Sequence, residues 1–234
     1  YLPEHEPRNF YQKYEVKYFP NMFVLDALNY VRDRLDGTLA YRWSCRMGVC
    51  GSCGALVNGI PRLTCATPLS ALGKGVTIEP LHNFPIIKDL VVDLDDFMEK
   101  LGRIKPWIIR ERDRVIEEGE YEQKPAELEL YSQFSACINC MLCYAACPVY
   151  AGDVDFIGPA ASALGYRYNL DSRDEGAEKR LEVLTEGAGI FDCTFVGECS
   201  VVCPKSVDPA LAIQRLKIDS ALTSLKSILK REKS

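Results

Sequence analysis

Eleven cysteines are the residues whose spacing points most directly to chemistry, and all of them fall into three groups. The groups are Cys45-x4-Cys50-x2-Cys53 with Cys65 following, Cys137-x2-Cys140-x2-Cys143-x3-Cys147-Pro148, and Cys193-x5-Cys199-x3-Cys203-Pro204. Thiolate sulfur is a soft ligand that suits iron in sulfide clusters. The first group is typical of a plant-type [2Fe–2S] site, and the second is the bacterial run found in ferredoxins with two clusters. The spacing therefore predicts the transfer of single electrons.

The third group is the bacterial run with one cysteine missing. Aligned on that run, the absent ligand falls at Val196. Valine has no lone pair for iron, so one corner of this cluster is expected to be vacant, which indicates [3Fe–4S]. A four-iron cluster with an outside ligand is the alternative. With one thiolate fewer, this centre should be easier to reduce than its four-iron neighbour, because net charge is one of the factors that set the potential.

The last cysteine of each bacterial run is expected to ligate the other cluster, because a short loop cannot reach around all corners of one cluster. The expected ligands of the [4Fe–4S] cluster are Cys137, Cys140, Cys143 and Cys203. The expected ligands of the [3Fe–4S] cluster are Cys147, Cys193 and Cys199. The expected ligands of the [2Fe–2S] cluster are Cys45, Cys50, Cys53 and Cys65.

Two other uses of cysteine fit the chain poorly. A disulfide framework is typical of small secreted proteins, whereas this chain has 234 residues and an odd number of cysteines. Structural zinc sites use about four ligands in spaced pairs, fewer than these runs supply. In the first loop, three glycines allow close backbone approach and N–H donation to cluster sulfur. Arg42 and Arg46 either place positive charge beside the cluster or are solvated surface residues.

Composition and missing motifs argue against nucleic-acid binding, a membrane span and a dinucleotide site. The net charge is −5, which does not favour nucleic acid as a partner. No apolar run approaches the roughly 20 residues of a membrane span, and no dinucleotide motif is present. His5 and His82 are expected to be surface or structural residues. Because no acid–base or nucleophile constellation stands out, substrate chemistry is expected to belong to another subunit.

The elements that must position the cysteines predict an α+β protein with two domains. Residues 1–95 are expected to form a plant-type ferredoxin (β-grasp) domain, whose first strand is expected to be missing upstream of Tyr1. Its predicted elements are a strand at 10–17, a helix capped by Asn21, a hairpin turning at Asn58-Gly59, and a strand at 75–81.

Residues 96–234 are expected to form a mainly helical domain that carries the two bacterial-type clusters. The predicted helices span 126–134, 159–168, 176–184 and 210–229, and residues 110–124 are expected to be an exposed linker or hairpin. Pro148 and Pro204 follow the distal cysteines and are expected to stop the helices of their runs.

The order of the three groups, with valine in the last, resembles the iron–sulfur subunit of succinate dehydrogenase and fumarate reductase. The supporting stretches are residues 41–47, 83–93, 156–160, 171–174 and 203–205. This resemblance implies a relay through the three clusters, between the FAD of a flavoprotein subunit and a quinone at a membrane anchor subunit. It also implies a peripheral location on the cytoplasmic face of the cell membrane.

Within that family, Val149 and Thr194 replace residues typical of ubiquinone-linked succinate dehydrogenases. The resemblance therefore favours fumarate reductase and menaquinone. It also implies that Lys217 lies close to the quinone, together with the neighbours of the three-iron centre. The candidate quinone residues are Pro148, Thr194, Phe195 and Lys217. A soluble multi-cluster electron carrier and a zinc-binding scaffold are the competing hypotheses.

Overall fold

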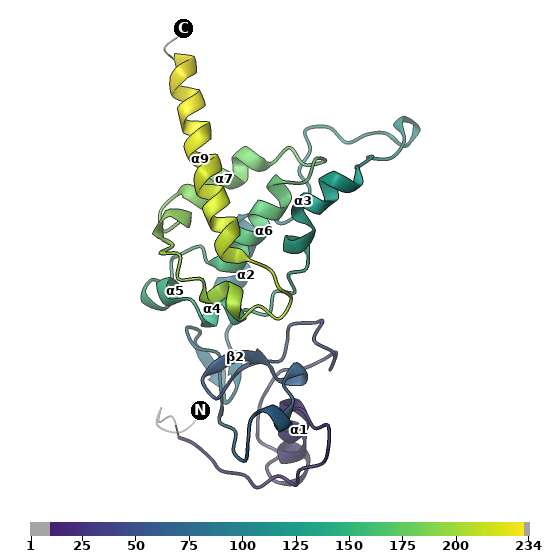
Figure 1. Ribbon diagram of the computed structural model, residues 1–234, viewed down its shortest axis with the longest axis vertical. Helices are drawn as coiled ribbons and strands as arrows, with labels where there is room; N and C mark the ends of the chain where they lie inside the picture. The colour runs from purple at the N-terminus through teal and green to yellow at the C-terminus, as the bar shows by residue number, and fades with distance from the viewer. Residues whose placement is uncertain (1–9, 232–234) are drawn as a thin grey trace. The chain divides into compact units, whose positions relative to one another are not determined.

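The computed structural model describes residues 10–231, which form two compact units (Figure 1). The first unit contains residues 10–96 together with 138–146, and the second contains residues 97–137 and 147–231. The segment 138–146, which lies inside the predicted C-terminal domain, thus belongs to the first unit. His82 is exposed, as expected, whereas His5 lies outside the described residues.

The first unit contains a small antiparallel sheet, as the sequence predicts. Strands β1 (Gly54–Val57) and β2 (Ile60–Leu63) form a hairpin, and β3 (Ile78–Glu79) pairs with the other edge of β1. Asn58 and Gly59 both have positive φ, at 51° and 77°, as a tight two-residue hairpin turn requires. The predicted hairpin is confirmed, although the predicted strand at 75–81 is reduced to two residues.

Helix α1 (Val24–Arg34) lies against this sheet through its apolar face. Val24 and Leu28 form a buried core with Val57 of β1. The predicted cap, Asn21, is wrong, because this residue lies before the helix in a left-handed conformation with φ 67°. The N-cap is Phe23, whose backbone N–H donates to the carboxylate of Asp26 at 2.9 Å. The acidic side chain in the first turn thus replaces an N-cap side chain.

The predicted strand at 10–17 is also wrong, since those residues pair with no strand of the described chain. Side chains hold this segment instead. The Tyr11 hydroxyl donates to Glu79 and the Tyr14 hydroxyl donates to Asp36, each at 2.5 Å. A second hairpin, β4 (Ile86–Lys88) and β5 (Val91–Val92), was not predicted, because its strands are too short to show alternation.

The second unit is helical, and the four long predicted helices are confirmed. Helix α6 (Pro159–Asn169) contacts α3 (Pro125–Ser135), α7 (Ala177–Thr185) and α9 (Pro209–Arg231). Their shared core contains Phe134, Ala163, Val207 and Ala212. Helix α2 (Asp95–Arg103), which begins at the boundary between the units, was not predicted. This unit also contains the short helical turn η4 (Ile190–Asp192), and the first unit contains two such turns, η1 (Thr64–Ala66) and η2 (Leu69–Ala71).

The helices within the cysteine runs are very short. They are α4 (Leu142–Ala145) and α8 (Glu198–Val201), and each ends before the distal cysteine of its run. Pro204 follows α8 as predicted. Pro148 has a different role, because it opens α5 (Pro148–Gly152) rather than simply ending α4. Proline is well suited to the first position of a helix, where an N–H group has no intrahelical partner.

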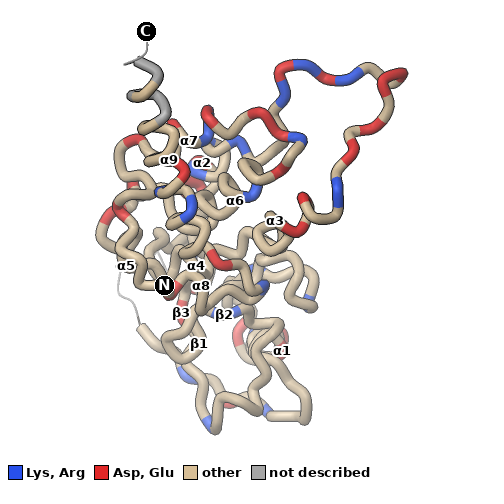
Figure 2. Tube along the Cα trace, turned by 45° about the horizontal axis from the view of Figure 1, so that its top comes forward, with Lys and Arg blue, Asp and Glu red and all other residues tan. Residues whose placement is uncertain are grey.

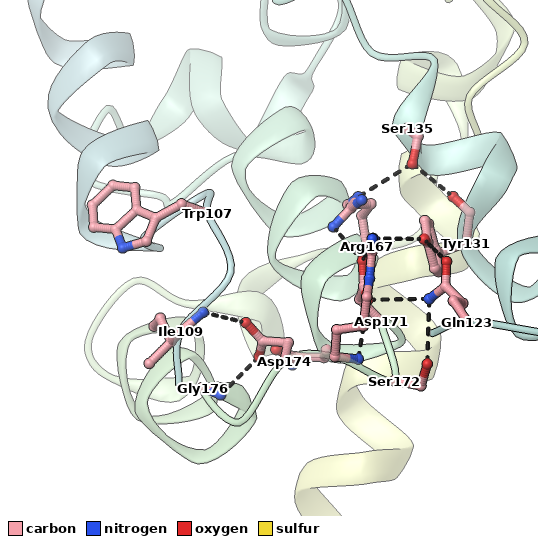
Figure 3. A network of polar contacts seen from close by, with 12 residues as sticks. Trp107, Ile109, Gln123, Tyr131, Ser135, Arg167, Asp171, Ser172, Asp174 and Gly176 are labelled. Carbon is pink, nitrogen blue, oxygen red and sulfur yellow. Dashed lines mark hydrogen bonds and ion pairs between the residues drawn. The ribbon is translucent and has the colours of Figure 1, made fainter. Parts of the chain in front are cut away.

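A buried ion pair and the hydrogen bonds around it fix the chain that follows α2. Figure 3 shows one of these bonds, from the Ile109 N–H to Asp174. Asp174 and Arg180 are paired at 2.6 Å, and neither side chain is exposed. Arg180 also donates to the backbone carbonyls of Lys105 and Trp107, while Asp174 accepts from the Ile109 N–H at 2.8 Å. Removing one partner alone from such a pair costs roughly 3–5 kcal/mol, because the other charge stays buried.

A second ionic group holds the other end of the predicted linker. Asp171 accepts hydrogen bonds from Arg173 at 2.8 Å and from Gln123 at 3.1 Å, and it pairs with Arg167 at 3.1 Å. Between these anchors, residues 111–120 are exposed and carry charges of both signs, with one short turn, η3 (Ile116–Glu118) (Figure 2). The prediction of an exposed linker at 110–124 is confirmed. Among the described residues, no helix is long and apolar enough to cross a membrane.

Candidate metal centres

The plant-type loop gathers backbone N–H groups around one of its cysteines. Cys45 Sγ accepts from the N–H groups of Met47 at 3.4 Å, and of Val49 and Cys50 at 3.3 Å. Gly48 N–H donates to Cys65 Sγ at 3.3 Å, which brings η1 to the loop. N–H donation of this kind is a feature of iron–sulfur sites, where it tunes the potential of the cluster. The loop therefore fits a cluster.

The electrostatic environment differs among the four cysteines of this group. Hydrogen bonds from Met47, Val49 and Cys50 lower the pKa of Cys45 to about 6. Burial raises the pKa of Cys65 to about 11, and a hydrogen bond to Cys53 and the charges of Cys53 and Cys45 add to this increase. The neighbours in these two shifts show that Cys45, Cys50, Cys53 and Cys65 lie together. Their assignment as the four ligands stays a prediction.

The three N–H donors to Cys45 belong to Met47, Val49 and Cys50 and not to the glycines of the loop, of which Gly48 donates to Cys65. Arg46 and Gly48 have positive φ, at 57° and 66°, and the N–H groups around them are the ones that reach Cys45 and Cys65. Arg46 also lies over the Trp43 ring, 4.6 Å from its centroid. Arg42 donates to the Val92 carbonyl at 2.9 Å. Both arginines therefore have contacts within the protein as well as their charge.

The third group meets the end of the second in the helical unit. Burial raises the pKa of Cys199 to about 11, and the charges of nearby Cys147 and Cys193 contribute to this increase. Burial likewise raises the pKa of Cys147, whose sulfur accepts from the Tyr150 N–H at 3.5 Å. Three cysteines from two separate runs are thus neighbours, in the combination expected for the three-iron centre.

Two of the expected four-iron ligands belong to the helical unit and two belong to the first unit. Cys137 and Cys203 pack against the same core, formed by Phe134, Ala163, Val207 and Ala212 in the helical unit. Cys140 and Cys143 are buried within the segment 138–146 of the first unit. In that segment Asn139 and Met141 have positive φ, at 52° and 63°. The common set of four remains a prediction.

The candidate quinone residues lie beside Cys147 and Cys193, two of the expected three-iron ligands. Pro148 and Thr194 are exposed and adjoin Cys147 and Cys193 in the chain. Phe195 and Val196 are 58% and 57% exposed. Lys217, on α9, donates from Nζ to the Cys193 carbonyl at 2.8 Å, a contact between residues 24 positions apart that no local pattern predicts. This lysine therefore touches the backbone of an expected cluster ligand.

The cysteines are all free thiols. Among residues 10–231, no three His, Cys, Asp or Glu side chains converge closely enough to hold a single metal ion. Iron–sulfur clusters make a different demand on the protein, because their own iron and sulfide atoms stand between the thiolates. The positions of the cysteines are thus compatible with clusters.

Together, the small sheet with its cysteine loop and the helical unit with crossed cysteine runs define an iron–sulfur electron-transfer protein. The models of two families match the chain. The "2Fe-2S iron-sulfur cluster binding domain" matches residues 1–99, and the "4Fe-4S dicluster domain" matches residues 133–207. The particular family follows from individual relatives.

The chain is 58% identical to the fumarate reductase iron–sulfur subunit of Mycobacterium tuberculosis, over 98% of this chain and 93% of that protein. It is 50% identical to the subunit of the same name from Escherichia coli O157:H7, over 98% and 94%. The succinate dehydrogenase iron–sulfur subunit of Coxiella burnetii is 34% identical over 93% and 92%. A chain of the solved Mycobacterium smegmatis Sdh1 complex superposes with a TM-score of 0.81 at 30% identity, over 89% and 88%.

This chain belongs to the family of fumarate reductase and succinate dehydrogenase iron–sulfur subunits. It is a subunit of an oxidoreductase complex, and it supplies iron–sulfur electron transfer to that complex.

Proposed function

We propose that this chain relays single electrons between the FAD of a flavoprotein subunit and a quinone at a membrane anchor subunit. The observation that carries the proposal is the meeting of Cys147 with Cys193 and Cys199. This nearness supports an exchange of the last cysteines between the two runs, as in ferredoxins with two clusters. Two cluster sites built from the same pair of runs lie close to each other, which suits the passage of electrons from one cluster to the next.

The proposed cofactors are one [2Fe–2S], one [4Fe–4S] and one [3Fe–4S] cluster, held by the three sets of cysteines named from the sequence. When bound, they accept and release one electron at a time. This chain's own residues hold them, donate N–H groups to their sulfurs and shield them from water. Val196 occupies the position of the missing ligand, and its exposed side chain offers no atom that binds iron.

The proposed quinone site adjoins the three-iron centre. Pro148, Thr194 and Phe195 are exposed beside its ligands, and Lys217 already donates a hydrogen bond there. A lysine ammonium in this position can hydrogen-bond a quinone oxygen and stabilise the negative charge that develops on it. The Nζ group has three donors, so its bond to the Cys193 carbonyl leaves capacity for a second acceptor.

Fumarate reductase with menaquinone is the favoured member of the family. The two fumarate reductase subunits described above are 58% and 50% identical to this chain, whereas the succinate dehydrogenase subunit of Coxiella burnetii is 34% identical. The proposed location is peripheral, on the cytoplasmic face of the cell membrane. A soluble multi-cluster carrier, the competing hypothesis, would need neither the anchor nor the quinone residues.

The test is electron paramagnetic resonance (EPR) of the purified complex, oxidised and reduced, with assays of succinate–quinone and quinol–fumarate activity. We expect a three-iron signal in the oxidised state and [2Fe–2S] and [4Fe–4S] signals on reduction. Recovery of the chain in membranes with a flavoprotein partner supports the relay. Recovery as a free soluble protein with the same clusters would favour the carrier instead.

A further inference from the structure

Two glycines at the end of the plant-type loop lie in close contact with the segment that follows Cys137. A Cβ atom added at Gly51 would lie 2.5 Å from the Ile138 carbonyl oxygen and 3.1 Å from Cys140 Cα. A Cβ atom added at Gly54 would lie 3.1 Å from Leu142 Cδ2 and 3.2 Å from the Cys140 carbonyl oxygen. No side chain fits at Gly51 without a shift of backbone, and Gly54 has little room.

Backbone conformation alone does not account for both glycines. Gly51 has φ +74°, a conformation that favours glycine in any loop. Gly54 has no such φ, and it opens strand β1, where other residues are equally suited to the backbone. Its lack of a side chain therefore matters for space. That space is taken by the backbone of Cys140 and the side chain of Leu142, and also by the side chain of Leu81, whose Cδ1 would lie 3.2 Å from the added Cβ.

The partner segment is held firmly in the same unit. The side-chain amide of Asn83 donates to the carbonyls of Tyr144 and Ala145 at 2.9 and 3.2 Å. The Phe84 ring lies 6.4 Å from the Tyr144 ring, centroid to centroid. Because the segment is anchored from its other end, a side chain at Gly51 would displace one cysteine loop from the other rather than be absorbed.

Both loops in this contact carry expected cluster ligands. Gly51 lies between Cys50 and Cys53, Gly54 follows Cys53, and both face the backbone of Cys140. We propose that Gly51 and Gly54 are positioning residues that set the separation between the [2Fe–2S] and [4Fe–4S] centres. The rate of electron transfer between two fixed centres falls steeply with distance. The absence of two side chains would thus determine how fast the first step inside this chain proceeds.

This inference rests on the proposed ligands, and its test uses matched pairs of variants in the whole complex. Gly51→Ala is compared with Gly59→Ala, because Gly59 has nearly the same φ, +77°, with no atom within 4 Å of an added Cβ. Gly54→Ala is compared with Gly75→Ala, where φ is not positive and the space is also open. In each pair, both variants replace glycine by alanine at positions that are alike in having, or not having, a positive φ, but only one of them adds a Cβ atom in a crowded position. A difference between the two therefore comes from crowding.

Two readouts report the separation of the centres. The first is the magnetic interaction between the two centres in the EPR spectrum of the reduced complex. The second is the rate, by freeze-quench EPR, at which electrons leave the [2Fe–2S] centre after mixing with succinate. We expect Gly51→Ala and Gly54→Ala to weaken the interaction and slow the transfer several-fold. Gly59→Ala and Gly75→Ala should change neither.

A compensating change keeps the test decisive if Gly51→Ala prevents cluster assembly. Leu142→Val removes Cδ2, the nearest of the three atoms that an added Cβ at Gly54 would meet, so it should restore part of the interaction in the Gly54→Ala variant. The inference is overturned if Gly54→Ala keeps both clusters with unchanged interaction and rate, or if Gly59→Ala has the same effect as Gly51→Ala. Absence of both reduced-state signals from the unmutated complex would instead refute the proposed function.

Discussion

The plant-type loop and the loop that contains Val196 hold their cysteines in contrasting ways. In the first, N–H groups converge on Cys45, and Gly51 packs against the next cysteine segment. In the second, Cys199 is buried while Phe195 and Val196 are more than half exposed. The first loop packs on one side against the Cys140 segment, although its Met47 and Val49 are 73% and 53% exposed. The second, the open loop, exposes Phe195 and Val196 beside Cys193, whose carbonyl accepts a hydrogen bond from Lys217.

This difference indicates that the two loops, which both carry expected cluster ligands, have different functions. A loop packed against another ligand segment fixes a distance within the chain. A loop with exposed apolar side chains beside an ammonium group can receive an amphipathic molecule with a polar oxygen, as a quinone is. Lys217 is the residue that links these properties, because it lies on α9 and donates to the backbone of the open loop.

The largest effect should come from the two cysteines that are exchanged between the runs. Cys147→Ala should abolish the three-iron signal, and Cys203→Ala should abolish the four-iron signal, because each removes a ligand from the cluster of the other run. EPR spectra of oxidised and reduced complex, with iron and sulfide analysis, measure this. The reverse pairing of losses would break the assignment. Serine variants at the same positions control for assembly, since cluster binding and folding are coupled.

The next effect concerns the vacant corner. Val196→Cys should supply a fourth thiolate and convert the three-iron centre to [4Fe–4S], with nearly complete loss of the oxidised-state signal and a lower potential. A redox titration followed by EPR measures both. Val201→Cys is the control, because Val201 is also exposed, at 78%, but lies outside the ligand position. A full signal at unchanged potential in Val196→Cys would mean that another residue faces the vacant corner.

A smaller, more selective effect is expected at the open loop. Lys217→Leu should lower quinol-dependent activity by on the order of 10²-fold, the usual loss when a donor to a developing negative charge is removed. Dye-linked succinate–fumarate turnover should be spared. Arg215→Leu, an exposed change on the same helix, should affect neither assay. Equal losses in both assays would indicate that the bond from Lys217 to the Cys193 carbonyl serves stability alone.

The smallest effect is expected on the stability of the helical unit, which contains the open loop and the ion pairs of Asp171. Burial alone would raise the pKa of Asp171, but its hydrogen bonds with Arg173 and the charges of Arg173 and Arg167 lower it to about 2. The ordinary value is 3.8, so this carboxylate contributes roughly 2 kcal/mol of stability. That contribution is complete above about pH 5 and is lost as the pH falls toward 2.

Asp171→Asn should therefore lower the urea midpoint by the same amount at every pH from 8 to 5, where the clusters can be kept intact. Asp33→Asn is the control, because its ion pair with Arg32 is exposed and contributes little. If the difference between wild type and Asp171→Asn changed across this range, a group other than Asp171 would be responsible.

Elements with strong local signals were predictable from the sequence. The hairpin at Asn58-Gly59 and the helices α3, α6, α7 and α9 were found because turn chemistry and apolar spacing act over a few residues. The strand predicted at 10–17 failed because a strand needs a partner, which local pattern cannot supply. Helix α2 was missed although Asp95 and Asp96 in its first turn and Lys100 and Arg103 in its last were usable signals.

The sequence by itself determined the chemistry, because ligand type and spacing specify a cluster whatever surrounds them. The three cysteine groups are visible in the sequence, and their spacing alone carries the predictions of a missing ligand at Val196 and of exchanged distal cysteines. Only the tertiary structure decided which groups surround the thiolates. The donors to Cys45, the packing of Gly51 and Gly54 on the Cys140 segment, and the bond from Lys217 to Cys193 join residues through folded contacts. Such contacts depend on how distant segments pack, and no pattern within one segment records them.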